Sequence, residues 1–212
     1  MNLLKVRFFL LGVFIVSLGV ILGTLFWLKL APRPGLTGWD TKPLEGLRRY
    51  GSVPEFSLVE RSGKPITLAD LRGSIWIADF IYTTCTDTCP LQTAQMAQLQ
   101  EEWKDRPELK LVSFSVDPEK DTTKVLSSYA ERYKADAHRW LFLTGAKKEI
   151  GRLVQEGFRL SAVPADGNAG VILHSPRFVL IDKQAEIRGY YDSREPSAMD
   201  RLKKDATTLM KG

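Results

Sequence analysis

The stretch Ile81–Pro90, IYTTCTDTCP, decides the fold and holds both cysteines of the chain, Cys85 and Cys89, with three residues between them. An apolar run, Ser74–Phe80, precedes this stretch, and a pattern typical of a helix follows it. A loop between a strand and a helix lies at the carboxyl edge of an α/β sheet, where such folds bind and react. We therefore expect both sulfurs to lie together at a functional edge.

The rest of the chain alternates strand-like and helix-like patterns. Strands are predicted at 56–60, 74–80, 109–116, 140–143, 177–182 and 186–191. One turn of helix is predicted at 67–71, and longer helices are predicted after Pro90, Pro118, Gly145 and from Pro196. The stretch 163–170 is predicted to be a loop. This order predicts an α/β sheet that is parallel in its early part and antiparallel at the final hairpin.

The N-terminal part contains an uncharged apolar run, Phe8–Leu28, which as a helix could cross the ~30 Å core of a bilayer. Lys5 and Arg7 precede the run, and Trp27 lies at its far end, where an aromatic residue suits the membrane interface. A cleaved signal peptide is the competing interpretation, but it has a shorter apolar core and a small-x-small cleavage site. We predict a single uncleaved transmembrane helix at 8–28.

The predicted anchor follows a short tail at 1–7 and precedes a tether at 29–50, which is rich in proline and glycine, and one globular domain at 51–212. Lys29 and Arg33 nearly balance the basic residues before the anchor. The short tail and the long segment after the anchor favour a domain outside the cytoplasm. We therefore expect a single-pass protein of the cell inner membrane, with the domain on the periplasmic or equivalent side.

The charge of the chain bears on its partners. The formal net charge is +5, from 30 Lys and Arg against 25 Asp and Glu, which suits an anionic membrane surface or an acidic partner protein. The basic residues are scattered, and no stripe of them alternates with aromatic residues. Nucleic-acid binding is therefore not predicted.

The spacing of the two cysteines permits two kinds of chemistry. If a helix begins at Thr86, Cys85 and Cys89 lie on one helical face about 5–6 Å apart at Cβ, and they can form a disulfide or bind one metal ion. The helix N-terminus favours thiolate, whereas Asp87 between the cysteines disfavours it. An inert disulfide and two buried thiols are the structural alternatives.

Copper is the metal that this donor set favours. Two thiolates alone do not suit structural zinc, which takes four protein ligands, whereas two sulfurs and one imidazole suit Cu(I) or Cu(II). His174 precedes the predicted hairpin, and in a thioredoxin-like arrangement its loop lies beside the cysteine loop; a strand-edge histidine without a ligand role is the alternative. His138, among charged residues, is predicted to be solvated. Asp117 and Asp121 are predicted to turn and cap rather than to bind.

Three pieces of the sequence together resemble the Sco/SenC family of copper proteins: Phe80–Pro90, Ser115–Thr122, and His174–Ser175 ahead of Leu180–Asp182. The resemblance covers roughly residues 51 to 212, and an anchor followed by a tether also fits the family's layout. It implies a thioredoxin-like, peroxiredoxin-type fold. It also implies a role in assembling the dinuclear copper centre of cytochrome c oxidase, by delivering copper, by reducing the receiving cysteines, or both.

Carried over by residue, the resemblance makes Cys85, Cys89 and His174 the copper ligands and the two cysteines a redox-active disulfide pair. Leu173 stands where many members have an acid, so the hydrogen bond that orients the imidazole must come from elsewhere. The expected partner is the copper-bearing subunit of the oxidase, and another copper chaperone is a further candidate. The expected function is that of an assembly factor rather than an enzyme.

Two enzymatic alternatives remain. The first is a thiol–disulfide oxidoreductase, although enzymes of the thioredoxin type have two residues between their cysteines instead of three. The second is a peroxidase of the related peroxiredoxin fold, which places Thr three residues before the reactive Cys and an Arg nearby. Here Tyr82 lies three residues before Cys85, and no Arg flanks the loop. The sequence therefore favours the oxidoreductase as the runner-up.

Overall fold

The computed structural model describes residues 12–17, 19–20, 22–23, 47–160, 163–164, 171–172 and 175–211. The chain divides into two units, 1–41 and 42–212. The described residues of the first unit are helical, and among all described residues no helix is long and apolar enough to cross a membrane. Most of the predicted transmembrane helix at 8–28 and of the tether at 29–50 lies outside the described residues.

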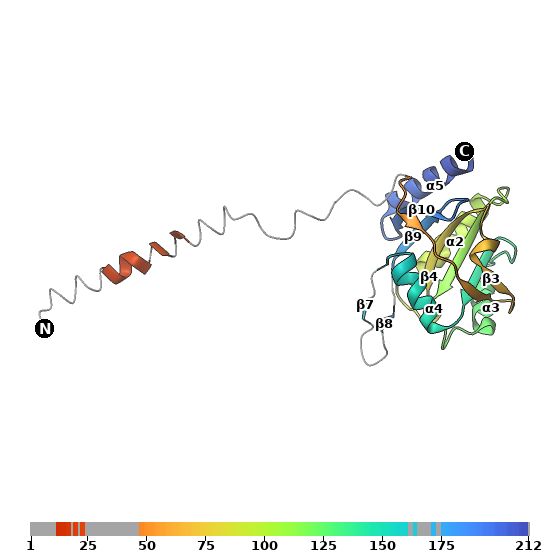
Figure 1. The fold of residues 1–212 in the computed structure, drawn as a ribbon, viewed down its shortest axis with the longest axis horizontal. Helices are drawn as coiled ribbons and strands as arrows, with labels where there is room; N and C mark the ends of the chain where they lie inside the picture. Colours follow the sequence, from red (N-terminus) through yellow and green to blue (C-terminus); the bar gives the residue numbers. More distant parts are fainter. Residues whose placement is uncertain are drawn as a thin grey trace, which may run out of the picture. The chain divides into compact units, whose positions relative to one another are not determined.

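The second unit is built on one mixed sheet. In the part of the chain that the structure describes, the sheet has eight strands in the order β1-β10-β9-β4-β5-β6-β2-β3 (Figure 1). The strands are β1 Gly51–Ser52, β2 Ser57–Glu60, β3 Pro65–Thr67, β4 Ile75–Ile81, β5 Leu109–Ser115, β6 Trp140–Thr144, β9 Arg177–Ile181 and β10 Glu186–Asp192. Strands β4, β5 and β6 are parallel, and β9 and β10 are antiparallel, as predicted. The prediction of a parallel early part is wrong for β2, the first predicted strand, which pairs antiparallel with β3 and β6.

Helices cover both faces of the sheet. The helical segments are the 3-10 turn η1 Leu68–Asp70, α2 Thr88–Glu102, α3 Thr123–Arg132, α4 Lys147–Arg152, the π-helical turn η2 Leu153–Gly157 and α5 Pro196–Lys211. Buried side chains of α2, α3 and α5 pack together on one face. Those of α4, η2 and η1 pack on the other face. The sheet is therefore the middle of three layers.

Strand β4 lies in the centre of the sheet, and all seven of its residues are buried. A strand that is covered on both faces is apolar at nearly every position, which explains the run in the sequence, interrupted here only by Asp79. Successive side chains point to opposite faces. Thus Ile77 and Ile81 pack on the side of α2, and Trp76 and Phe80 pack on the side of α4.

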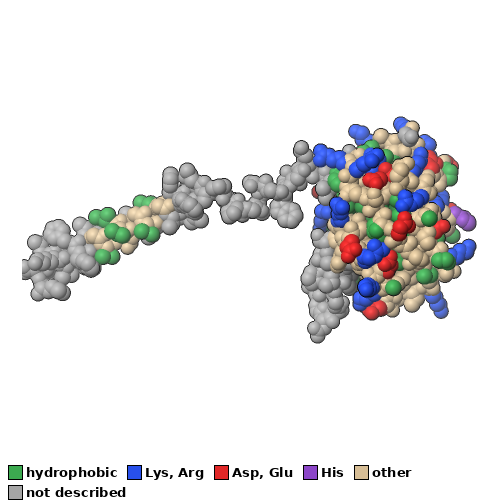
Figure 2. Space-filling model, viewed as in Figure 1, with side chains coloured by type: hydrophobic (Ala, Val, Ile, Leu, Met, Phe, Trp, Pro, Cys, Tyr) green, Lys and Arg blue, Asp and Glu red, His purple; other side chains and the backbone are tan. Residues whose placement is uncertain are grey.

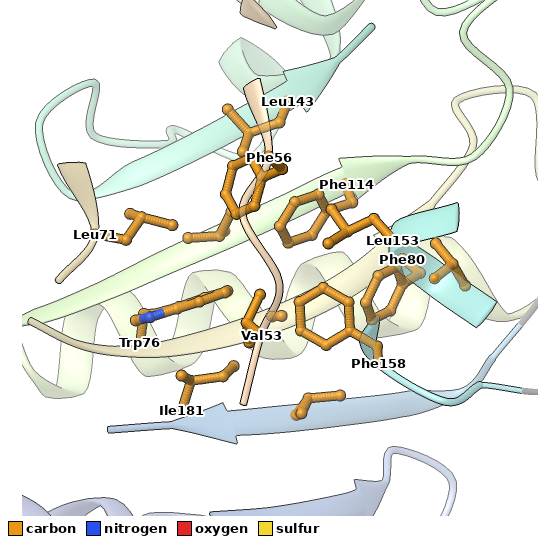
Figure 3. Close-up of a cluster of buried hydrophobic side chains, with 14 of the residues drawn as sticks. Val53, Phe56, Leu71, Trp76, Phe80, Phe114, Leu143, Leu153, Phe158 and Ile181 are labelled. Atoms are coloured by element: carbon orange, nitrogen blue, oxygen red, sulfur yellow. The ribbon is translucent and has the colours of Figure 1, made fainter. Parts of the chain in front are cut away.

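A cluster of aromatic rings fills the side of the sheet that faces α4 (Figure 3). The ring of Phe114 in β5 lies at its centre, 5.5 Å from the ring of Phe80 and 5.4 Å from that of Phe158, measured between centroids. Phe56 and Trp76 lie at 5.9 and 6.3 Å from Phe114. These contacts hold β4 and β5 in place on the face of the sheet opposite to that of the cysteines.

Several segments differ from the sequence prediction. The short strands β1 and β3 were not predicted. The predicted loop at 163–170 begins with the short strand β7 Val163–Pro164, which pairs antiparallel with β8 Val171–Ile172, directly after the predicted loop. The third predicted helix is α-helical only through Arg152 and then continues as the π-helical turn η2. The apolar spacing that predicted this helix is compatible with both helical forms.

The surface of the second unit carries charges of both signs. Figure 2 shows Lys and Arg side chains interspersed with Asp and Glu side chains over the face that is in view. Mixed charge of this kind gives no extended basic footprint on that face.

Candidate copper and dithiol site

The two cysteines come from different local structures. Cys85 lies in the loop after β4, where its N–H donates a 3.0 Å hydrogen bond to the carbonyl of Tyr82. Helix α2 begins at Thr88, so Cys89 is in its first turn. A shared helical face required a helix from Thr86, and this condition is not met, because Cys85 precedes the helix. Pro90 is tolerated as the third helical residue, since N–H groups of the first turn have no intrahelical partner.

The loop nevertheless brings the two thiols together. Neither cysteine is in a disulfide, and their side chains are hydrogen-bonded to each other. The Cys85 side is nearer to solvent, with 8% of the residue exposed against 1% for Cys89. The site is thus a buried dithiol in which Cys85 is closer to the surface. The two sulfurs are adjacent, as predicted.

The thiol of Cys85 is the more acidic one. Burial raises its pKa, but hydrogen bonds from the Cys89 thiol, from backbone N–H groups of Cys89 and Asp87, and from the Tyr82 hydroxyl outweigh burial. The result is a pKa of about 6, below the ordinary value of 9.0. The hydrogen bond to Cys85 in turn raises the pKa of Tyr82, so its hydroxyl keeps the proton that it donates.

The thiol of Cys89 behaves in the opposite way. Burial raises its pKa, and the hydrogen bond to Cys85, the charge of Cys85 and the charge of Asp79 raise it further, against a single opposing backbone hydrogen bond at Tyr82. At neutral pH the pair therefore combines a thiolate at Cys85 with a thiol at Cys89. Because the thiolate is the nucleophile and the metal-binding form, Cys85 is the sulfur that reacts first.

Asp121 fastens the cysteine loop to the neighbouring strand. Its buried carboxylate accepts from the N–H of Thr83 at 3.2 Å, from the Thr83 hydroxyl at 2.5 Å and from the Ser115 hydroxyl at 2.6 Å. Thr83 is two residues before Cys85, and Ser115 ends β5. The sequence suggested a turn or cap for Asp121, whereas in the structure its carboxylate links the cysteine loop at Thr83 to the end of β5 at Ser115.

We expect the substitution Asp121→Asn to destabilise the reduced protein by about 1–3 kcal/mol. An amide can accept at only one end, so its NH₂ group would face a donor of Thr83 or Ser115. The measurement is urea unfolding of the reduced protein. The control is Glu119→Gln, which removes the exposed ion pair with Lys147 at 2.9 Å and should change stability by less than about 1 kcal/mol. Equal effects of the two substitutions would contradict this link through Asp121.

The structure describes one of the two histidines of the chain. His138 is exposed, as predicted. His174 lies outside the described residues, and among the described ones no group of three or more His, Cys, Asp or Glu could hold a metal ion. The next described residue, Ser175, is attached to helix α2, because its carbonyl accepts a 3.3 Å hydrogen bond from Nε2 of Gln92.

Sequence reasoning missed the buried acid Asp79, and for Asp121, which it named as a turn or cap, it missed the contact with Thr83. Asp79 lies within an otherwise apolar buried strand, and that interruption was a signal in the sequence. Thr83 lies far from Asp121 along the chain, so no local pattern could reveal their contact.

Residues 47–210 match the SCO1/SenC family model. The SCO1 protein homolog of Bacillus subtilis (strain 168) is 34% identical over 162 residues, which are 74% of this chain and 83% of that protein.

Two solved structures show the same fold. BsSco, described as a member of the Sco family of cytochrome c oxidase assembly proteins with a disulfide switch, has a TM-score of 0.68 at 30% identity, covering 79% of this chain and 97% of BsSco. Bradyrhizobium japonicum ScoI, solved with copper bound, has a TM-score of 0.60 at 25% identity, covering 73% of this chain and 99% of ScoI. The predicted thioredoxin-like fold is confirmed, and the chain belongs to the SCO1/SenC family.

Proposed function

We propose that this protein is a membrane-anchored copper metallochaperone that assists assembly of the dinuclear copper centre of cytochrome c oxidase. The observation that carries the proposal is the adjacent pair of thiols, of which Cys85 is a thiolate at neutral pH. The BsSco and ScoI relatives support it, since one is described as an oxidase assembly protein and the other was solved with copper bound. The partner would be the copper-bearing subunit of the oxidase.

The donor set fits copper as cargo. Cys85 and Cys89 supply two soft sulfurs in a largely dehydrated place, which favours copper over oxygen-seeking metals. We assign His174 as the third ligand. The hydrogen bond between Gln92 and the Ser175 carbonyl supports this, because it holds the residue after His174 against the helix that carries Cys89.

The proposal includes the anchor. The uncharged run at 8–28 supports a transmembrane helix, and the tether at 29–50 would let the second unit reach a membrane-bound partner. In this arrangement the protein lies in the cell inner membrane with its globular unit on the periplasmic or equivalent side.

The different pKa values of the two thiols favour a second function. A nucleophilic thiolate at Cys85 beside a protonated Cys89 is the arrangement that thiol–disulfide exchange requires. The alternative is therefore a reductase that acts on the copper-site cysteines of the oxidase subunit. The two functions use the same sulfurs and differ in their need for His174.

The substitution His174→Ala tests the copper function. The full-length reduced protein is titrated with Cu(II) and followed by optical absorption and electron paramagnetic resonance. We expect the wild type to bind one copper with strong sulfur-to-copper charge transfer. We expect the substitution to weaken binding by tenfold or more, about the effect of a lost ligand interaction, and to change both spectra.

His138→Ala is the matched control, because His138 is the other histidine of the chain and is exposed. It should leave the affinity and the spectra unchanged. If His174→Ala binds copper like the wild type, or if the wild type binds none, the three-ligand site is wrong. The reductase would then be the better account of the dithiol.

A further inference from the structure

A cavity of about 400 Å³ lies at the end of the sheet away from the cysteine loop. It is lined by Glu60, the last residue of β2, and by Leu141, the second residue of β6. Strand β6 runs parallel to β5 and β4, so its first residues lie at the edge opposite to the one that carries the cysteines. The volume is in the range of sites that hold small ligands, about 300–1,000 Å³. The cavity is therefore separate from the dithiol.

One wall of the cavity is the turn between β2 and β3, and Arg61 fastens this turn to three other segments. The N–H of Arg61 donates to the carbonyl of Phe142 at 2.9 Å, and its guanidinium carbon lies 5.2 Å from the centroid of the Phe142 ring. The carbonyl of Arg61 accepts from the Ser127 hydroxyl of α3 at 3.2 Å. Nη2 of Arg61 donates to the carbonyl of Ala135 at 3.1 Å. These contacts pre-form the wall.

Glu60 brings a buried carboxylate to the cavity, and this carboxylate lacks a hydrogen bond. Only 5% of the residue is exposed. Its Oε2 accepts a 2.6 Å hydrogen bond from the N–H of Ser62, whereas no described residue donates to its Oε1. Nε of Arg61 lies 3.5 Å from Oε1, at ion-pair distance without a hydrogen bond. A buried oxygen in this state is costly, and an N–H group of a ligand in the cavity would satisfy it.

The charges that line the cavity favour an anionic ligand. They are one acid, Glu60, and two bases, Arg61 and Lys64. Arg61 lies close enough to Glu60 to balance its charge. Lys64 is exposed and forms no ion pair with a described residue, so its charge is in excess. His138, which is exposed and also lines the cavity, adds an N–H donor. A carboxylate is a group that such donors bind.

The rest of the lining is mainly apolar. It includes Ile66 of β3, Ala137 before β6 and Leu141. Ile66 and Leu141 pack against the buried cluster on the α4 side of the sheet, but each is only half-buried. An apolar side chain of a ligand would cover these two residues and remove apolar surface from water.

We propose that the cavity binds the carboxyl end of a peptide chain whose last side chain is apolar. The terminal carboxylate binds Lys64, and the amide N–H of the last residue donates to Oε1 of Glu60. The last side chain covers Ile66 and Leu141. A peptide end supplies these three groups in a single residue. A free amino acid has no amide N–H and is neutral overall, and a fatty acid has no N–H. The partner is therefore the C-terminal tail of a protein.

The test compares two peptides that differ only in the terminal group, acetyl-alanyl-leucine and its C-terminal amide. Each is added to the full-length, reduced, isotopically labelled protein, and the backbone amide signals are followed by NMR. We expect the acid to shift signals of residues 60–66 and 137–141, with a dissociation constant below about 1 mM. The amide should bind at least tenfold more weakly, about the effect of a lost charge-assisted hydrogen bond.

Further comparisons assign the parts of the site. Acetyl-alanyl-glycine, which has no apolar side chain, should bind the wild type about tenfold more weakly than the leucine peptide. Lys64→Gln should weaken binding of the leucine acid about fivefold and leave that of the amide unchanged. Lys148→Gln is the matched control, because Lys148 is an exposed lysine of α4 that does not line the cavity, and it should change neither affinity.

Three outcomes on the wild type would overturn the proposal, so it does not depend on the folding of a variant. Equal affinities of the acid and the amide would exclude recognition of the carboxylate. Unchanged signals up to the solubility of the acid would show that the cavity binds no peptide end. Shifts confined to the cysteine loop would place the peptide at the other end of the sheet. None of these outcomes affects the copper function, which the copper titration tests at Cys85, Cys89 and His174.

Discussion

Alkylation of the reduced protein at pH 7 should modify Cys85 at least about 100-fold faster than Cys89. Hydrogen bonds hold the pKa of Cys85 at about 6 in spite of its burial, so most of it is thiolate at this pH. Burial raises the pKa of Cys89 above its ordinary value of 9.0, so less than about 1% is thiolate. The measurement is the time course of iodoacetamide labelling, with the modified cysteine identified by fragment-ion mass spectrometry.

The pH dependence of this labelling has a defined sign. The rate at Cys85 should be nearly constant from pH 9 down to about 7 and should fall as the pH passes below about 6, because the thiolate is then protonated. An unperturbed thiol would already lose rate below pH 9. Equal labelling of both cysteines, or a rate at Cys85 that falls from pH 9 onward, would contradict the assignment of Cys85 as the nucleophile.

Tyr82→Phe should slow this labelling at pH 7, because it removes the hydroxyl that donates to Cys85 and so raises the pKa of the thiol toward its ordinary value. Tyr133→Phe is the matched control. Tyr133 is a half-buried tyrosine on the α3 side that packs against Tyr129, with 5.2 Å between ring centroids, and it does not contribute to the pKa of Cys85.

The substitution Phe114→Ala should lower the free energy of unfolding by about 3–5 kcal/mol. The ring of Phe114 is fully buried on the face of the sheet that α4 covers, and it contacts four other aromatic rings. Without the ring, the protein loses the free energy gained by moving it out of water, and a cavity remains. Strand β5 is paired on both sides, with β4 and β6, so it cannot shift to close the cavity. This is a large share of the stability of an ordinary domain.

Urea unfolding measures this effect. The midpoint should move to lower urea with little change in slope, since the surface exposed on unfolding hardly changes. Val125→Ala is the control, because Val125 is an exposed apolar residue of α3, and it should change stability by no more than about 0.5 kcal/mol. A loss below about 1 kcal/mol for Phe114→Ala would show that the aromatic cluster repacks.

Part of the fold was predictable because a strand covered on both faces of the sheet has a recognisable apolar sequence. The run that became β4 is apolar at every position except Asp79 because both faces of the sheet are covered. Helix α5 was predictable for a different reason, since Pro196 marks its start and apolar residues recur on one face. Local patterns of this kind depend only on near neighbours in the chain.

The start of helix α2 and the properties of the site depend on distant contacts. The sequence predicted a helix that begins near Pro90 and allowed a start at Thr86, but the chain turns at Cys85 and becomes helical at Thr88, while Asp121 binds the preceding Thr83 from another loop. The different pKa values of the two thiols likewise follow from burial and hydrogen bonds that only the folded chain creates. The role of His174 stays a prediction.

The ends of the sheet have a consequence for how copies of the protein meet. Its outermost strands are short: β1 has two residues, and β3 has three and begins with Pro65, which has no N–H to offer. Short edges that contain proline discourage the strand-to-strand pairing that leads to aggregation. Even at high local concentration, the edges of the sheet should therefore not join two copies of the protein strand to strand.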